Sequence, residues 1–330
     1  MNTKTKPEDL ILGIDLGGSK ILAAVVNSQG EMLSRDHSVT PAEKGPEAVI
    51  YEILQAARRA LKQAGITIAE VKAIGVGAPG ACNPDTGIVS SSPNLPEWKD
   101  VPLRDIIARE LGVKTFLVND ANAAALGELC FGAGRGARNL IYVTISTGIG
   151  GGVIIDGKLY SGTSGAAGEI GHMTIDVNGP RCNCGNIGCW ETLASGTALA
   201  KEARRKIGEG EKTSILDHAQ GDIEQVTAET IHAAAQEGDA LARELITRTG
   251  YYVGVGFVNL VNIFNPELII IGGGLSNMGE MLLEPAINVV KERAFKAAHE
   301  VVRFALPQLG LNSGVLGAAA LALQEMKTGE

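Results

Sequence analysis

Two stretches of this chain share one pattern, an apolar strand followed by a glycine-rich turn and a second apolar strand. The first is Leu10–Val26, LILGIDLGGSKILAAVV, and the second is Leu140–Asp156, LIYVTISTGIGGGVIID. Apolar runs of this length that are interrupted by glycines are typical of buried strands joined by tight turns. Because the pattern occurs twice, we expect two α/β units in tandem, each opening with a strand, a turn and a strand.

The segments after each stretch predict further strands and helices. The first unit should continue with strands over Glu31–Val39, Ala73–Gly77 and Thr115–Val118 and with helices from about Pro46 to Gly65 and from Pro102 to Gly112. The second should contain a strand over Leu268–Ile271, a helix from about Met278 to Ala298, a short strand over Val301–Leu306 and a terminal helix from about Ser313. Proline near a helix start and glycine just past its end support these boundaries.

Charge and hydropathy exclude several classes of protein. The 330 residues include 29 Lys+Arg and 37 Asp+Glu. This acidic balance does not favour binding to the negatively charged phosphates of a nucleic acid. The first residues lack the apolar core of a signal peptide, and the apolar stretch Tyr251–Phe264 is shorter than the ~20 residues of a membrane span. We therefore expect a cytoplasmic protein with small-molecule ligands and with no nucleic-acid or membrane partner.

Three glycine-rich turns follow apolar strands, namely Asp15–Lys20, Ser146–Gly152 and Gly272–Gly274. Glycines in such turns let main-chain N–H groups approach a phosphate without a Cβ atom in the way. The P-loop pattern is missing, and Val153 stands where a dinucleotide-binding turn needs glycine or alanine. Each turn alone is more often a tight hairpin, but three together favour nucleotide binding. Asp15 ends its strand, where a carboxylate is suited to hold Mg²⁺ beside a triphosphate.

Three of the five cysteines, Cys182, Cys184 and Cys189, lie within eight positions, and His172 precedes them. Three thiolates and one imidazole complete a tetrahedral zinc site with no open position, so this zinc should be structural and should not activate water. The alternative is a group of buried free thiols, which the density of the cluster makes the weaker interpretation.

Two carboxylates flank the expected ligands. Glu169 lies three residues before His172, and Glu191 lies two residues after Cys189. A metal that joins His172 to Cys189 also brings both carboxylates into one neighbourhood, where they can accept hydrogen bonds from the hydroxyls of a polyol. Glu191 could instead be only a carboxylate at a helix start, because Thr192 and a helical stretch follow it.

Asn119 and Asp120 end an apolar strand and open an alanine-rich helix. Asp120 could be no more than the N-cap of that helix. Alternatively, it lies at the carboxyl end of a strand, where α/β proteins keep reactive groups, and accepts the proton of an alcohol that attacks a γ-phosphate. The residues themselves do not choose between these interpretations.

With these motifs in place, the chain resembles the ROK family of sugar kinases, most closely the bacterial glucokinases of that family. The resemblance extends from Leu10 to about Ala322. It rests on Asp15-Leu-Gly-Gly-Ser-Lys20, Gly77-Ala-Pro-Gly80, Asn119-Asp-Ala-Asn122, the run from Ile145 to His172, the run from Cys182 to Glu191, and Gly272-Gly-Gly274.

The resemblance implies an α/β, two-lobed actin-like ATPase (RNase H-like) fold with duplicated βββαβα units and a structural zinc loop at about 172–191. The smaller N-terminal lobe should comprise 1–119 plus 311–330, and the larger lobe 120–310. The last helix should cross back onto the N-terminal lobe.

The resemblance also assigns roles to particular residues. Asp120 is expected to be the catalytic base. Hexose contacts are expected from Gly80, Asn94, Asn119, Asp120, Glu169, His172 and Glu191. The ATP and Mg²⁺ site is expected to comprise Gly13, Ile14, Asp15, Leu16, Gly17, Gly18, Ser19, Lys20, Ser146, Thr147, Gly148, Ile149, Gly150, Gly151, Gly152, Val153, Gly272, Gly273 and Gly274. Zinc is expected on His172, Cys182, Cys184 and Cys189, and it should support the sugar site more than the glycine turns, which belong to other strands.

The implied activity is that of an ATP-dependent hexose kinase, with glucose as the expected acceptor. Kinases for N-acetylglucosamine, N-acetylmannosamine, mannose or fructose are the alternatives; Ala81 disfavours the N-acetylsugars, because some of their kinases carry arginine there. A sugar-sensing repressor of the same family is disfavoured, because only about twelve residues precede the first expected phosphate loop, Gly13–Lys20, too few for a helix-turn-helix. We expect a homodimer or a homotetramer.

Overall fold

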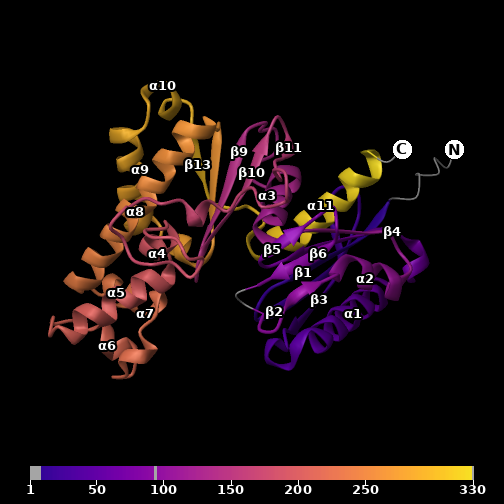
Figure 1. Cartoon of the computed structure of the whole chain (residues 1–330), viewed down its shortest axis with the longest axis horizontal. Coiled ribbons are helices and arrows are strands. Elements are labelled where there is room, and N and C mark those ends of the chain that lie inside the picture. Colours follow the sequence, from indigo (N-terminus) through magenta and orange to yellow (C-terminus); the bar gives the residue numbers. More distant parts are fainter. Residues whose placement is uncertain (1–8, 93–94, 329–330) are drawn as a thin grey trace. The chain divides into compact units, whose positions relative to one another are not determined.

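The chain folds into two α/β units and contains two five-stranded sheets (Figure 1). The computed structural model describes residues 9–92 and 95–328. Unit 1 comprises Met1–Arg138, Gly152–Gly168 and Pro307–Glu330, and unit 2 comprises Asn139–Gly151 and Glu169–Leu306. The predicted lobes, 1–119 plus 311–330 and 120–310, have other boundaries than these two units. The predicted division into lobes stays a prediction.

The sheet of unit 1 has the strand order β3-β2-β1-β4-β8. Its strands are β1 (Leu10–Leu16), β2 (Lys20–Val26), β3 (Met32–Val39), β4 (Val71–Ala78) and β8 (Thr115–Asn119). β1, β2 and β3 pair antiparallel, whereas β1, β4 and β8 pair parallel. The three-stranded sheet of β5 (Ala81–Asn83), β6 (Ile88–Ser91) and β7 (Lys99–Val101) follows β4 along the chain.

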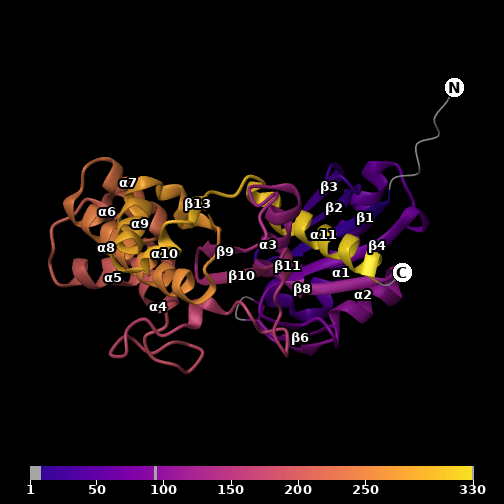
Figure 2. The same ribbon diagram turned by 90° about the horizontal axis from the view of Figure 1, so that it is seen from above.

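Both faces of the unit 1 sheet are buried, which explains the continuous apolar runs of its strands. On β1, Leu12 and Ile14 join the core with α1 (Gly45–Ala64) and α2 (Leu103–Leu111), whereas Ile11 joins the core with α11. The α11 helix (Ser313–Thr328) lies along the sheet beside α3 (Asp120–Phe131), and it is the yellow helix of Figure 2. The last helix therefore packs on the N-terminal unit, as predicted.

The second sheet has the order β11-β10-β9-β12-β13, which repeats the order of the first sheet strand for strand. Its strands are β9 (Leu140–Ile145), β10 (Ile149–Ile155), β11 (Lys158–Leu159), β12 (Leu268–Gly272) and β13 (Arg303–Ala305). As in the first sheet, the last two strands are parallel to the opening one. This common topology confirms the duplication that the glycine-rich stretches predicted.

Helices pack on the unit 2 strands β9 and β12, and one large apolar core lies between them (Figure 1). They are α4 (Glu191–Ala194), α5 (Gly196–Gly208), α6 (Ile215–His218), α7 (Ala228–Gln236), α8 (Ala240–Phe264), α9 (Glu280–Arg293) and α10 (Lys296–His299). The apolar stretch Tyr251–Phe264 is the C-terminal half of α8. None of the helices in the described part of the chain has the length and apolar character needed to cross a membrane.

Most predicted boundaries lie within two residues of those in the structure, and two elements differ by more. The helix predicted over Met278–Ala298 is divided into α9 and α10, because Ala294 is extended and the Asn262 side chain accepts the Phe295 N–H at 2.8 Å. The second glycine turn is shorter than predicted, because Gly150, Gly151 and Gly152 belong to β10.

Candidate active site

The parallel strands of unit 1 bring several predicted site residues to one edge of the sheet. Asp15 on β1 pairs with Gly77 on β4, and Ala78 pairs with Asn119 on β8. Asp15, the Gly80 turn and the Asn119–Asp120 pair therefore lie at the carboxyl ends of neighbouring strands, where α/β proteins place ligands. Asn94 lies outside the described residues.

Asn119 is the N-cap of α3. Its side-chain oxygen accepts the N–H groups of Ala121 at 2.9 Å and Asn122 at 3.4 Å, and its Nδ2 donates to the Gly80 carbonyl at 3.0 Å. Asp120 is the first residue of the helix, and its Oδ1 also accepts the Ala121 N–H. The interpretation of Asp120 as the N-cap is therefore wrong, because Asn119 has the extended backbone and occupies that position.

Asp15 and Asp120 interact electrostatically at this edge. Burial, and then the charge of Asp120, raise the pKa of Asp15 from 3.8 to about 7. Two carboxylates that repel each other are the donor set that a hard divalent cation such as Mg²⁺ prefers, so these residues fit the expected metal.

The first glycine turn has fewer residues than the predicted stretch Asp15–Lys20. Only Gly17, Gly18 and Ser19 connect the strands, because Gly13, Ile14, Asp15 and Leu16 belong to β1 and Lys20 opens β2. A Cβ atom on Gly13 would lie 2.4 Å from the Val315 carbonyl oxygen of α11. Close packing against α11 therefore explains why a glycine occupies position 13. A contact between Gly13 and the nucleotide stays a prediction.

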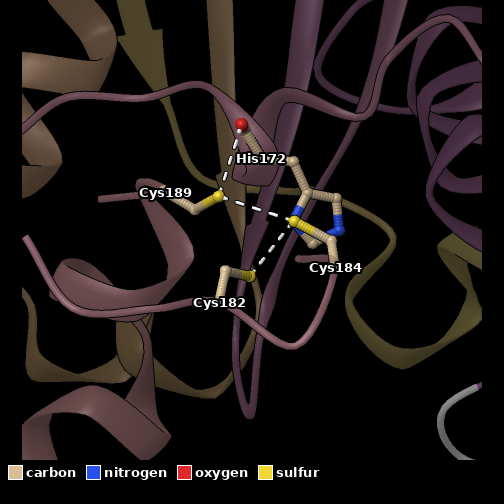
Figure 3. Close-up of side chains that lie close together, drawn as sticks. All are labelled: His172, Cys182, Cys184 and Cys189. Carbon is tan, nitrogen blue, oxygen red and sulfur yellow. Dashed lines mark hydrogen bonds between the residues drawn. The ribbon is translucent and has the colours of Figure 1, made fainter. Parts of the chain in front are cut away.

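His172, Cys182, Cys184 and Cys189 converge in unit 2, as Figure 3 shows. Their ligand atoms all lie within 4.8 Å of one another. Cys184 Sγ is 3.7 Å from Cys189 Sγ, and Cys182 Sγ is 3.7 Å from His172 Nδ1. Two sulfurs bound tetrahedrally to one zinc, each about 2.3 Å from it, lie about 3.8 Å apart. The four residues therefore fit a zinc ion.

Electrostatics at the cluster also favour a cation. Burial raises the pKa of Cys189 to about 12, and the neighbouring sulfurs of Cys184 and Cys182 act in the same direction. A thiolate at this position therefore needs a nearby positive charge at neutral pH, which zinc supplies. The segment His172–Glu191, here called the zinc loop, is closed by short bridges between Thr174 and Cys189 and between Arg181 and Ile187.

The zinc loop is fixed to unit 2 by Trp190, which follows the ligand Cys189. The indole is fully buried, and its Nε1–H donates to the Tyr252 carbonyl of α8 at 2.9 Å. A Cβ atom on Gly256 would lie 2.1 Å from the ring, so a glycine on α8 makes room for it. The same ring packs edge to face on Phe257.

Glu169, His172 and Glu191 form a polar group beside the cluster. With His172 Nδ1 facing the sulfurs, its Nε2 lies 3.9 Å from Glu169 Oε2. Burial raises the pKa of Glu169, the His172 side chain lowers it, and the charge of Glu191 raises it further. The structure thus brings together the two carboxylates and the imidazole that were predicted to bind a sugar.

The second glycine turn is held by the elements around it. Ser146, Thr147 and Gly148 form the turn, whereas Ile149, Gly150, Gly151, Gly152 and Val153 lie in β10. The N–H of Gly196, at the start of α5, donates to the Ser146 carbonyl at 2.7 Å, and the Thr197 hydroxyl donates to the Thr147 carbonyl at 2.8 Å. Gly272 ends β12, and Gly273 and Gly274 follow it.

A pocket of about 420 Å³ opens next to this turn. It is lined by Ser146, Thr147, Gly196, Thr197, Ala200, Lys201, Arg204, Val226, Thr227, Ala228, Glu229, Gly274 and Leu275. The lining residues from α5 and α7 were not predicted from the sequence, although the helix start at Ser195–Gly196, soon after Glu191, was a usable signal. The volume is in the range of a small-molecule site, and Lys201 and Arg204 add positive charge.

The chain is similar to known proteins over nearly its whole length. The chain is 38% identical over 327 residues to the glucokinase of Thermotoga maritima, with 96% of this chain and 98% of that protein covered. It is 35% identical to the xylose repressor of Caldicellulosiruptor bescii, covering 96% of this chain and 78% of the repressor. The crystal structure of a ROK family glucokinase from Streptomyces griseus in complex with glucose and AMPPNP aligns with a TM-score of 0.82, at 35% identity, over 96% of this chain and 99% of that one.

These similarities cover nearly the whole chain. The sequence profile of the ROK family matches residues 11–325. The chain is therefore a member of the ROK family, with the two-lobed actin-like ATPase fold of that family.

Proposed function

We propose that this protein is an ATP-dependent hexose kinase that converts glucose to glucose 6-phosphate. The observation that supports this most directly is its similarity, over 96% of the chain, to a glucokinase solved with glucose and AMPPNP. The polar group of Glu169, His172 and Glu191 supplies acceptors for sugar hydroxyls. The pocket beside Ser146 and Thr147 suits the nucleoside of ATP.

In the proposed reaction, the carboxylate of Asp120 accepts the proton of the glucose 6-hydroxyl. The freed oxygen forms a bond to the γ-phosphorus of ATP as the bond from that phosphorus to the β,γ-bridging oxygen breaks, and ADP leaves with the electron pair. Positioning and charge neutralisation supply most of the rate enhancement of such transfers. When bound, Mg²⁺ neutralises phosphate charge, and Asp15 is the residue suited to hold it.

Zinc has a structural role in this proposal. Bound by His172, Cys182, Cys184 and Cys189, it has no open position for a substrate. Coordination through Nδ1 together with the three cysteines would fix the His172 ring with Nε2 toward Glu169, where it can meet the sugar. The remaining glycine-turn residues named from the sequence are proposed to contact the phosphates.

The test is a coupled assay of the purified protein with glucose, mannose, fructose, N-acetylglucosamine and N-acetylmannosamine, each with ATP, ADP or polyphosphate. We expect the highest kcat/KM for glucose with ATP. Failure to phosphorylate glucose, or a higher kcat/KM for another hexose, would contradict the assignment. Light scattering of the same sample tests the proposed homodimer or homotetramer.

A sugar-sensing repressor is the second candidate, and the similarity to a xylose repressor favours it. The two candidates differ in turnover. A repressor binds a sugar such as xylose without transferring phosphate, whereas the kinase consumes one ATP for each glucose.

A further inference from the structure

The carboxylate of Glu191 belongs to the zinc loop but lies against the second glycine turn. Its Oε2 accepts the Ile149 N–H at 2.8 Å. A Cβ atom on Gly148 would lie 2.2 Å from the same oxygen, so only glycine leaves room for the carboxylate there. One side chain thus touches two consecutive residues of the segment that is proposed to hold the phosphates.

The position of this carboxylate is set by its neighbours in the chain. Glu191 is the first residue of α4 and follows Trp190, which the Tyr252 carbonyl and the space at Gly256 hold in the core. On the other side, the turn is closed by a bond from the Ser146 N–H to the Gly148 carbonyl at 2.8 Å. The fixed carboxylate therefore holds the segment at Ile149, whereas the hydrogen bonds from α5 hold it at Ser146 and Thr147.

We propose that Glu191 is a positioning residue for the Ser146–Gly152 segment, in addition to the contact with hexose that the proposed function gives it. Oε2 holds the Ile149 N–H, and Oε1 makes no hydrogen bond within the described part of the chain, which leaves it for a sugar hydroxyl. The turn is thereby kept in its nucleotide-binding shape before either substrate arrives, and this lowers the ordering cost of binding. The zinc loop, which was expected to support the sugar site more than the glycine turns, then supports the second of these turns as well.

The test compares Glu191→Ala and Glu191→Gln with a matched control, Glu169→Gln. Glu169 is the neighbouring carboxylate, but it faces His172 instead of the turn. The first readout is amide hydrogen exchange of Ile149, followed by NMR without sugar or nucleotide. A hydrogen bond to a charged group contributes enough for Glu191→Ala to speed this exchange by about 10-fold or more. Glutamine retains an acceptor oxygen, so Glu191→Gln should keep most of the protection, and Glu169→Gln should keep all of it.

The second readout is the calorimetric affinity for AMPPNP, again without sugar. Glu191→Ala should weaken it at least about threefold, Glu191→Gln less, and Glu169→Gln not at all. Gly148→Ala, which leaves Glu191 in place but crowds its carboxylate, should reproduce the Glu191→Ala result. Zinc content and melting temperature are measured for every variant, so that unfolding is recognised.

Wild-type exchange and AMPPNP affinity in a folded Glu191→Ala protein would overturn the inference. An equal loss of both in Glu169→Gln would also overturn it, because the effect would then belong to the polar group in general. Failure of the proposed function is a separate result, since it would show as absent glucose phosphorylation by the wild type while Ile149 exchange still reports on Glu191.

Discussion

At the residue scale, the two aspartates of unit 1 have different surroundings and different expected tasks. Asn119, and not Asp120, caps α3, because the Asn119 side chain accepts two N–H groups of that helix. Asp15 is buried close enough to Asp120 for the charge of one to raise the pKa of the other. Asp120→Asn should therefore change activity far more than stability, whereas Asp15→Asn should change both.

Asp120→Asn should lower kcat by at least ~10²-fold, because an amide cannot accept the hydroxyl proton in the transfer step. Stability should change little, since Asn119 still caps the helix. Glucose affinity by calorimetry should stay within a fewfold of wild type. A folded variant with near-normal turnover would show that Asp120 is not the base.

Asp15→Asn should stabilise the ligand-free protein in a pH-dependent manner. The folded-state pKa of Asp15, about 7, lies above its ordinary value of 3.8, so folding favours the protonated form. The stability that this group contributes is present below about pH 4 and is lost as the pH rises through 7. Asparagine stays neutral, so the melting temperature of the variant should exceed that of wild type by roughly 2–5 °C at pH 8 and by less at pH 5.

The measurement is thermal unfolding of both proteins at the two pH values without added Mg²⁺ or nucleotide. Activity should fall in the same variant, because the expected Mg²⁺ ligand is lost. A variant less stable than wild type at pH 8 would contradict the raised pKa.

At the scale of elements, the zinc loop joins two proposed sites within unit 2. Glu169 lies three residues before the loop and interacts with His172, its first residue, and Glu191 is its last residue. Because Glu191 also holds the Ile149 N–H, the loop supports the second glycine turn as well as the sugar site. Loss of the metal should therefore weaken ligand binding at the sugar site and at the second glycine turn.

Cys184→Ser should release zinc, since one of four ligands is removed, and should weaken glucose binding by about 10-fold or more. AMPPNP binding should also weaken, but less, because α5 still holds the turn through Gly196 and Thr197. Elemental analysis and the two titrations test this. The control is Cys82→Ser, which removes a thiol of unit 1 outside the cluster. Normal glucose affinity in a zinc-free protein would contradict the link between cluster and sugar site.

At the scale of the whole molecule, the chain leaves unit 2 near Leu306 and returns to unit 1, where a buried carboxylate receives it. Glu128 of α3 is fully buried and accepts the N–H groups of Gln308 and Leu309 at 3.0 Å and the Ser313 hydroxyl at 2.7 Å. These bonds attach the segment before α11 to the helix that begins with Asp120. Glu128 is thus a support for the way the chain re-enters unit 1.

Glu128→Ala should lower the free energy of unfolding by about 2–4 kcal/mol, because several buried donors lose their acceptor at once. Glu110→Gln is the matched surface control, since Glu110 pairs only with the exposed Arg109 at 3.3 Å in the described structure, and it should cost less than about 0.5 kcal/mol. Denaturant titrations of the three proteins provide the comparison. A loss in Glu128→Ala no larger than in the control would exclude this role.

Local patterns in the sequence were sufficient for the elements and for the cluster of one histidine and three cysteines. Strand and helix periods, the doubled glycine-rich stretch and the spacing of His172, Cys182, Cys184 and Cys189 all depend on residues close together in the chain. Each of these is a repeat or a spacing that needs no knowledge of distant contacts. For the same reason, the duplicated topology and the ligand cluster agree with the structure.

Only the tertiary structure decided the contacts between distant segments. The bond from Ile149 N–H to Glu191 joins residues 42 positions apart, and Glu128 reaches Ser313 across 185 positions. The pocket beside Ser146 combines residues from α5, α7 and the end of β12. No local pattern encodes such pairs, because a carboxylate in the sequence has many possible donors and only packing selects one. The cap of α3 was undetermined for a related reason, since Asn119 and Asp120 both have capping side chains and only the backbone conformation assigns the role to Asn119.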